Sequence, residues 1–151
     1  MGAIETSETV NEIDLNAYNY IGVFLTFDCL RACSYCLNES NGGLEKRGTI
    51  EGKIWKEGLN RIKTDAPLTF NGGEPLLHSD FFDIVNGLEE CLKLDLLTTL
   101  PIDAKDFIKN LNPRGFERDL PYSAIRVTFH PETMDLSETV QNRSNSPHRS
   151  V

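Results

Sequence analysis

The sequence predicts an α/β fold built from parallel strands. Two patterns alternate along its 151 residues: short segments of apolar, β-branched and aromatic residues, and longer segments in which apolar residues recur at helical spacing. This alternation, which begins and ends with a strand-like segment, is typical of parallel β/α units. We therefore expect a partial β/α barrel in which about four units are present.

The first strand is expected over residues 20–27, because this segment is almost continuously apolar, as in a strand that is covered on both faces. After a turn-rich segment over 38–43, apolar residues recur near helical spacing and predict a first helix over 49–63. Pro67 ends that helical pattern. A short second strand is then expected over 68–70.

Ser79 is a suitable N-cap for a second helix, which we expect to extend to about Lys93. Cys91 falls on the apolar stripe of this helix together with Phe81. A free cysteine on such a stripe behaves as a small buried hydrophobic residue, so we expect Cys91 in the core. The next apolar segment, 94–100, predicts a third strand.

The third helix is expected to begin after Asp103, whose side chain can cap it, and to end before Pro113. Its predicted buried side carries Phe107, Ile108 and Leu111. The fourth strand is expected over 123–130, where apolar and polar residues alternate with a period of two. One face carries Ile125, Val127 and Phe129, and the other carries Arg126, Thr128 and His130.

These elements predict one folded domain between two polar ends. Residues 1–17 are polar and acidic without periodicity, and we expect them to form a loose arm. The core is expected over 18–140, with a fourth helix starting near its end. Residues 141–151 are polar and contain proline and serine, which predicts a disordered tail.

Composition excludes two classes of partner. The net charge of −8 and the lack of a basic stripe argue against nucleic-acid binding, which relies on clustered Lys and Arg. No segment approaches the length of about 18 apolar residues that a membrane helix needs, and the N-terminus has no signal-peptide pattern. We expect a cytoplasmic protein without a membrane partner.

Three cysteines follow the first strand at the spacing C-x3-C-x2-C: Cys29, Cys33 and Cys36. An iron–sulfur cube normally takes four thiolates, so three local ones would leave one iron with an open coordination position. The alternatives are a zinc site with a distant fourth ligand, or a disulfide with a spare thiol. Zinc motifs usually contain a second close pair of ligands, and this chain has none. A fourth zinc ligand would have to be a distant histidine: His78, His130 or His148.

Two glycines, Gly72 and Gly73, follow the second strand. Without a Cβ atom they allow a sharp turn and a close approach of the backbone to a ligand. Glu74 is then presented beside this bare backbone, where a carboxylate and carbonyl oxygens suit an ammonium group. The alternative is a plain turn with a solvated glutamate.

Together these two motifs resemble the radical S-adenosylmethionine (SAM) superfamily. The cysteine loop, with Tyr35 directly before its last cysteine, resembles the signature of the superfamily. The segment Thr69–Pro75 resembles its Gly-Gly-Glu segment at the end of the second strand. The resemblance covers roughly residues 18–140.

The resemblance implies a set of site residues. Cys29, Cys33 and Cys36 would hold a [4Fe–4S] cluster whose remaining iron binds SAM. The α-amino group of SAM would be held by Glu74 and by the backbone at Gly72 and Gly73, and Tyr35 would lie near the adenine. Contacts to the ribose or carboxylate would come from the end of the fourth strand, where the candidates are Thr128 and His130.

The implied activity is reductive cleavage of SAM to a 5′-deoxyadenosyl radical, which takes hydrogen from a substrate that the sequence does not identify. A reductant such as ferredoxin or flavodoxin would supply the electron. An alternative is a non-catalytic interaction module in which the same thiolates only stabilise the fold. An electron-transfer protein is a third alternative, but it ordinarily requires four thiolates.

The sequence also departs from this family. The family fold has six β/α units, and no fifth or sixth strand is predicted after 123–130. We expect a truncated core; a partner chain that completes the barrel and an inactive remnant are the alternatives. Arg126 could pair with a carboxylate inside the barrel or with an acidic neighbour on the surface.

Overall fold

The computed structural model describes residues 11–36, 38, 49–117 and 122–144, and these form an α/β fold. Its main sheet has four parallel strands in the order β2-β4-β5-β6, which is also their order in the chain. The strands are β2 (Ile21–Phe24), β4 (Leu68–Asn71), β5 (Leu94–Thr98) and β6 (Ile125–Val127). The predicted α/β class and the parallel sheet of a partial barrel are confirmed.

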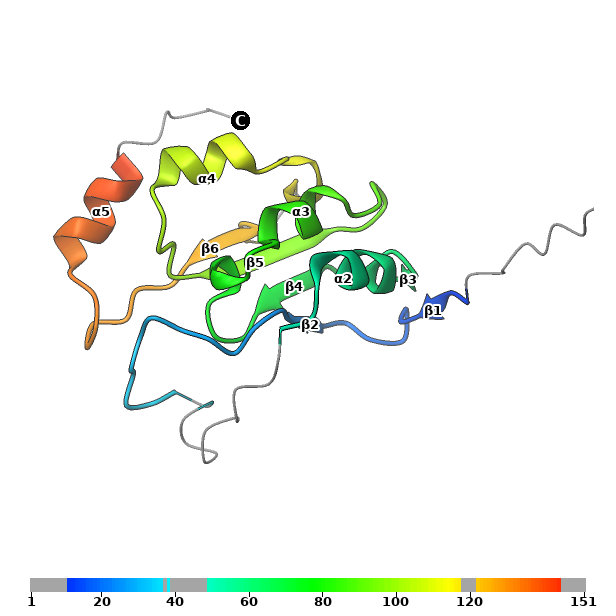
Figure 1. Ribbon diagram of the computed structural model, residues 1–151, viewed down its shortest axis with the longest axis horizontal. Coiled ribbons are helices and arrows are strands. Elements are labelled where there is room, and N and C mark those ends of the chain that lie inside the picture. Colours follow the sequence, from blue (N-terminus) through cyan, green and yellow to red (C-terminus); the bar gives the residue numbers. More distant parts are fainter. Residues whose placement is uncertain (1–10, 37, 39–48, 118–121, 145–151) are drawn as a thin grey trace, which may run out of the picture.

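The helices that connect these strands lie on one side of the sheet, as Figure 1 shows. They are α2 (Gly52–Leu59), α3 (Phe81–Asn86) and α4 (Ala104–Asn110). Right-handed crossovers between strands that pair in chain order place all helices on the same face. The core lies between this face and the helices, and its most deeply buried members include Leu68, Phe70, Phe81, Ile84 and Leu96.

The first helix is shorter than predicted. It ends at Leu59, and the side-chain amide of Asn60 donates a hydrogen bond of 3.1 Å to the carbonyl of Gly87. The chain then extends, and β3 (Ile62–Lys63) pairs in parallel with β1 (Ile13–Asp14). Strands of two residues carry no periodic pattern, so neither was predicted, and part of the expected N-terminal arm is paired.

The second helix also differs from its prediction. It begins after Asp80 rather than Ser79 and ends at Asn86, because the chain turns at Gly87. Cys91 therefore lies beyond the helix and is exposed, so its predicted place in the core is wrong. The apolar spacing continued past the glycine, but the helix did not.

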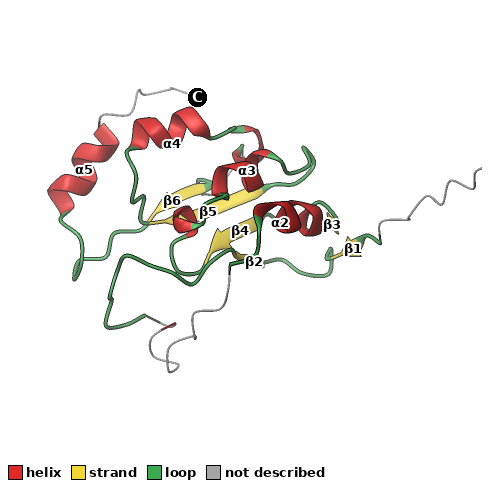
Figure 2. Ribbon diagram, viewed as in Figure 1, coloured by secondary structure: helices red, strands yellow, loops and turns green. Residues whose placement is uncertain are grey.

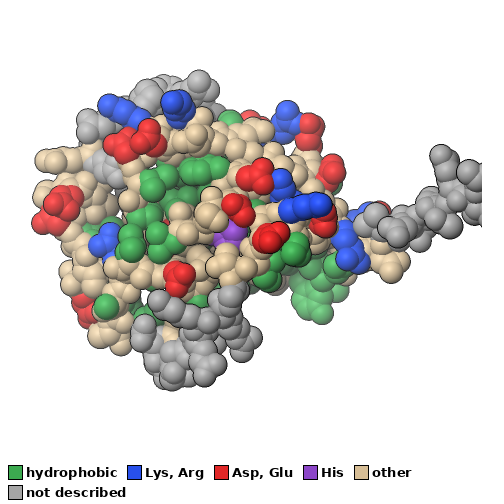
Figure 3. Space-filling view, in the orientation of Figure 1, with side chains coloured by type: hydrophobic (Ala, Val, Ile, Leu, Met, Phe, Trp, Pro, Cys, Tyr) green, Lys and Arg blue, Asp and Glu red, His purple; other side chains and the backbone are tan. Residues whose placement is uncertain are grey.

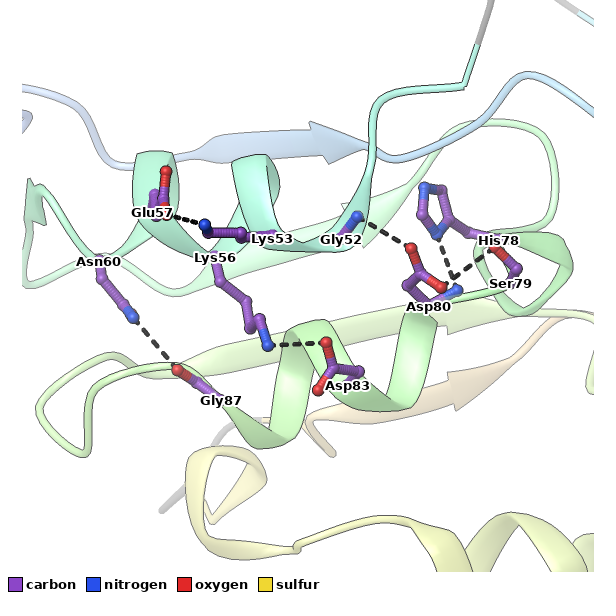
Figure 4. A network of polar contacts seen from close by, with 10 residues as sticks. All are labelled: Gly52, Lys53, Lys56, Glu57, Asn60, His78, Ser79, Asp80, Asp83 and Gly87. Carbon is purple, nitrogen blue, oxygen red and sulfur yellow. Dashed lines mark hydrogen bonds and ion pairs between the residues drawn. The ribbon is translucent and has the colours of Figure 1, made fainter.

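Figure 4 shows the polar contacts that join α2 to α3. The amide of Gly52 donates a hydrogen bond of 2.9 Å to the carboxylate of Asp80, and Lys56 forms an ion pair of 2.7 Å with Asp83. His78 accepts a hydrogen bond of 3.1 Å from the amide of Asp80 through Nδ1. Its Nε2 lies 3.0 Å from the carbonyl of Ile50, so the neutral ring fits as a donor there. These contacts join the two helices to each other.

The third helix has the predicted cap, since the side chain of Asp103 accepts a hydrogen bond of 2.8 Å from the amide of Lys105. Phe107 is buried as expected, but Ile108 is 47% exposed, so its predicted burial is wrong. The helix is only seven residues long. Its buried side carries Ala104 and Phe107, and Leu111, directly after the helix, is partly buried against the core as expected.

The C-terminal part contains β6 and the helix α5 (Leu136–Ser144). The strand is shorter than the predicted 123–130, and the expected tail at 141–151 overlaps the last residues of α5. The rest of that predicted tail, 145–151, lies outside the described residues, as do residues 1–10 of the predicted arm. In the part of the chain that the structure describes, no helix is long and apolar enough to cross a membrane.

On the face seen in Figure 3, the described Lys and Arg side chains lie among Asp and Glu side chains instead of forming a stripe. Ion pairs account for part of this mixing, among them Lys56 with Asp83 and Lys63 with Glu12.

Candidate functional site

The predicted motifs lie on loops that leave the C-terminal ends of the strands. Figure 2 shows long loops after β2 and β6 at the same end of the sheet. We call residues 26–36 the Cys loop and residues 128–135 the β6 loop. In parallel β/α folds, functional groups gather at this edge because every strand ends there. The Gly-Gly-Glu turn after β4 reaches the same edge.

The three loop cysteines have different surroundings. Cys29 is exposed, Cys33 is only 6% exposed, and Cys36 is half-buried. The amide of Cys36 donates a hydrogen bond of 3.1 Å to the carbonyl of Cys33, which forms a tight turn around Ser34 and Tyr35. All three thiols are free. In the described chain, no three His, Cys, Asp or Glu side chains are gathered closely enough to hold a metal ion.

The charge environment of Cys29 links it to the other motif. Partial burial raises the pKa of its thiol, and the negative charge of Glu74 raises this pKa further, as do the neighbouring Cys33 and Cys36. A hydrogen bond from the amide of Arg31 to Cys29 Sγ, 3.4 Å long, acts in the opposite direction. The negative charge of Glu74 thus acts on the thiol of Cys29, on the neighbouring loop.

The Gly-Gly-Glu turn packs directly against the start of the Cys loop. The amide of Gly73 donates to the carbonyl of Thr26 (3.1 Å), and the amide of Glu74 donates to the carbonyl of Asp28 (2.8 Å). A Cβ atom on Gly73 would lie 2.2 Å from the carbonyl oxygen of Asp28. Gly72 has φ of +118°, and a Cβ atom there would lie 2.9 Å from the carbonyl oxygen of Thr26. The glycines are thus required for the approach of one loop to the other.

The side chain of Glu74 is almost completely buried, at 1% exposure. Its Oε2 accepts two hydrogen bonds from Thr99, from the amide and from the hydroxyl, each 2.7 Å long. Its Oε1 accepts from the hydroxyl of Thr98 (2.6 Å) and from the amide of Leu76 (3.2 Å). Glu74 therefore ties the end of β4 to the end of β5, while its predicted contact with the amino group of SAM stays a prediction.

Thr98 and Thr99 are site residues that the sequence did not predict. Thr98 is the last residue of β5 and Thr99 follows it, at the same end of the sheet where Gly72 and the cysteines follow their own strands. This shared position is the signal that could have identified them. The hydroxyl of Thr98 also accepts a hydrogen bond of 2.8 Å from the amide of Leu100. Leu100 has φ of +52°, a left-handed conformation that is strained for a leucine and is common near functional sites.

The Cys loop makes a second set of contacts, to the β6 loop. The hydroxyl of Tyr35 lies 2.9 Å from Nδ1 of His130, and their rings stack with centroids 5.9 Å apart. Ser34 donates two hydrogen bonds to the carboxylate of Glu132, from its amide (2.9 Å) and its hydroxyl (2.7 Å). The predicted site residues Tyr35 and His130 are thus brought together, and Glu132 was not predicted.

Thr133 adds two contacts to the same interface. Its carbonyl accepts a hydrogen bond of 2.7 Å from Arg31 Nη1, and its hydroxyl lies 3.9 Å from Cys33 Sγ. Thr128 is exposed, and its amide donates to the carbonyl of Thr98 (2.8 Å). The predicted contacts of Thr128 and His130 with SAM stay predictions.

Arg126 pairs with a buried carboxylate on the neighbouring strand. Its Nη2 lies 3.2 Å from Oδ2 of Asp95, a β5 residue whose side chain is 2% exposed. Its guanidinium also lies 4.6 Å from the centre of the Tyr122 ring. Of the two predicted alternatives for Arg126, the structure shows the first.

A cavity of about 200 Å³ lies between the Cys loop, the ends of β5 and β6, and α5. This volume is below the 300–1,000 Å³ that drug-sized ligands occupy. Its wall combines one cationic side chain with hydroxyl, carboxylate and apolar groups: Arg31, Thr99, Leu100, Pro101, Val127, Thr133, Met134, Asp135, Glu138 and Thr139. The cavity can therefore hold part of a larger polar ligand.

Comparison with known proteins gives a partial similarity. No family model matches the chain. Over 82 residues, or 52% of its length, the chain is 30% identical to an S-adenosylmethionine-dependent nucleotide dehydratase from Selenomonas ruminantium. The chain covers 28% of that protein, so it spans about a quarter of the length of this curated relative. The similarity connects the chain with a SAM-dependent enzyme.

Proposed function

We propose that this chain forms the cluster-binding part of a radical SAM enzyme. The observation that carries the proposal is the direct contact between its two motifs. The Cys loop after β2 and the Gly-Gly-Glu turn after β4 are joined by backbone hydrogen bonds from Gly73 to Thr26 and from Glu74 to Asp28. A metal site that only stabilises the fold does not require a glycine turn next to it. Similarity to a SAM-dependent relative supports the same assignment.

The donor set fits a [4Fe–4S] cluster. Cys29, Cys33 and Cys36 lie on one loop, and soft thiolates are the ligands that such clusters take. Three protein thiolates would leave one iron for another ligand. Because the described thiols are not gathered as a metal site, the cysteine side chains would have to turn toward the cluster as it binds.

SAM would lie beside the Gly-Gly-Glu turn, where the resemblance places its amino group. The oxygens of Glu74 already accept four hydrogen bonds from Leu76, Thr98 and Thr99. Direct contact between this carboxylate and an ammonium group would thus require the exchange of one of these bonds. We assign the ammonium first to backbone carbonyl groups of the turn, and we assign to Glu74 the task of holding that turn in place.

When bound, the cluster would supply the electron for reductive cleavage of SAM. The residues of this chain position the reactants. The glycine turn sets the distance between the ends of β2 and β4. Glu74 joins the end of β4 to the end of β5. Tyr35 and His130 form a stacked aromatic surface on which an adenine ring can lie. A reductant such as ferredoxin or flavodoxin would deliver the electron.

The substrate and the rest of the active site belong to the same proposal. Because the relative acts on a nucleotide, nucleotides are the first substrate class to test. Strands that complete the barrel would come from further chain or from a partner, since β6 is an edge strand among the described strands.

The proposal is tested by anaerobic reconstitution with iron and sulfide, followed by equilibrium dialysis against SAM. We expect about four irons per chain and SAM binding that requires the cluster. A variant with Cys29, Cys33 and Cys36 changed to alanine should take up neither. Binding of one zinc ion without cluster assembly would contradict the proposal and favour the non-catalytic interaction module.

A further inference from the structure

We propose that Glu132 is a positioning residue that holds the cysteine loop in its cluster-binding conformation. The inference rests on the proposed function, because it assigns Cys33 and Cys36 to the cluster. Glu132 lies on the β6 loop and belongs to neither motif that carries the resemblance. Its proposed task is to fix the backbone turn between these two cysteines, so that only side chains need to rearrange when the cluster binds.

The contact between Glu132 and Ser34 uses both carboxylate oxygens. The amide of Ser34 donates to Oε2 (2.9 Å), and its hydroxyl donates to Oε1 (2.7 Å). Two parallel bonds to a charged acceptor fix orientation as well as distance, and they are stronger than bonds between neutral groups. The pKa of Glu132 is lowered by these same bonds, the amide bond first. Ser34 lies directly after Cys33 and two residues before Cys36, so its position limits where both thiols can lie.

Three neighbouring contacts act in the same direction. Arg31 donates to the carbonyl of Thr133, the thiol of Cys33 lies against the hydroxyl of Thr133, and Tyr35 contacts His130. Four residues in the second half of the Cys loop, Arg31 and residues 33–35, thus contact the β6 loop. Because β2 and β6 are the outer strands of the four-stranded sheet, these contacts bridge its two edges.

Glu132 is the member of this interface whose removal is easiest to interpret. Within the described chain, both hydrogen bonds of its carboxylate go to Ser34, and it does not line the cavity. It is exposed, so alanine at this position should leave the core unchanged. Glu89 is also exposed but lies at the opposite end of the molecule, after α3, and provides a matched control.

The first test uses the reduced, metal-free protein. Cys33 is buried, so its alkylation requires the loop to open, whereas Cys29 and Cys91 are exposed and serve as internal references. Alkylation of each cysteine is followed by peptide mass spectrometry. We expect Glu132→Ala to accelerate the labelling of Cys33 about tenfold relative to the wild type. The labelling rate of Glu132→Gln should lie between those of the wild type and Glu132→Ala. The labelling of Cys91 and the midpoint of thermal unfolding should not change, and Glu89→Ala should match the wild type.

The second test uses the reconstituted protein. Iron loss to a chelator should be about tenfold faster in Glu132→Ala than in Glu89→Ala, and Ser34→Ala should show part of the same effect. Equal Cys33 labelling and equal iron loss in all variants would overturn the proposal. A fall in thermal stability that accounts for faster labelling of every cysteine would also overturn it. If the wild type takes up no cluster, the proposed function fails, and the labelling test still decides whether Glu132 positions the loop.

Discussion

Glu74 and Thr99 are joined by two hydrogen bonds of 2.7 Å, which run from the amide and the hydroxyl of the threonine to the same carboxylate oxygen. The amide of Glu74 is bonded in turn to the carbonyl of Asp28, at the start of the Cys loop. One residue therefore connects the ends of β2, β4 and β5. The geometry at the candidate site depends on this connection, because all three strand ends contribute to it.

Replacement of Glu74 by alanine should destabilise the fold. The change leaves the donors of Thr98 and Thr99 without their buried acceptor, and the loss of a partner in a buried charged contact costs about 3 kcal/mol or more. Urea unfolding at neutral pH measures this loss. Glu57→Ala, at an exposed position on α2, should change the free energy of unfolding by less than about 0.5 kcal/mol. Similar stabilities for the two variants would contradict the assigned role.

A Cβ atom at Gly73 should disrupt the contact between the two motifs. It would lie 2.2 Å from the carbonyl oxygen of Asp28, so the backbone of one loop has to move. We expect Gly73→Ala to cost about 2 kcal/mol or more in unfolding free energy. Gly58 on α2 is the matched control, since nothing lies within 4 Å of its Cβ position. Gly58→Ala should stabilise the protein by about 0.5–1 kcal/mol, and equal effects of the two changes would argue against a close approach at Gly73.

Acid should remove the contribution of the Asp80 contact. The hydrogen bond from the amide of Gly52 lowers the pKa of Asp80 below its usual value of 3.8, so the carboxylate stabilises the folded state above that pH. The contribution is lost as the pH falls from 3.8 through the lower folded-state pKa. The difference in urea midpoint between the wild type and Asp80→Asn should therefore be constant above about pH 5 and shrink in acid. A difference that grew as the pH fell would reverse the assigned sign.

Cys91 should be dispensable for iron binding. It is exposed, and it lies between α3 and β5, remote in the chain from the Cys loop. We expect Cys91→Ala to take up as much iron on anaerobic reconstitution as the wild type, whereas Cys33→Ala should lose most of it. A variant without Cys91 that is depleted in iron would show that this thiol serves as a fourth ligand.

The order of the main elements could be predicted from the sequence because their signals are local. Short segments of mainly apolar or alternating residues located the four main strands, and Asp103 located the start of α4. Element ends were less predictable, because tertiary contacts decide them. The end of α2 at Leu59 is one example, since Asn60 bonds to Gly87, the residue directly after α3. The misplaced Cys91 is another, because the helical spacing of apolar residues continued beyond the turn at Gly87.

The candidate site was predictable only in part, for a similar reason. The cysteines and the glycine turn are short motifs, and each can be identified without knowledge of the fold. The partners of these motifs lie far away in the sequence: Ser34 and Glu132 are 98 positions apart, and Glu74 and Thr99 are 25 positions apart. No local pattern marks a glutamate or a threonine as the partner of a distant loop. Only the parallel sheet, which gathers the strand ends at one edge, brings them together.

In the proposed function, the Cys loop would hold a cluster with an open iron that SAM would occupy. Electron paramagnetic resonance of the reduced, reconstituted protein, recorded with and without SAM, is the decisive test. We predict a signal typical of a [4Fe–4S] cluster whose shape changes when SAM is added. A cluster signal that SAM leaves unchanged would contradict the claim, because the remaining iron would then not be available to the cofactor.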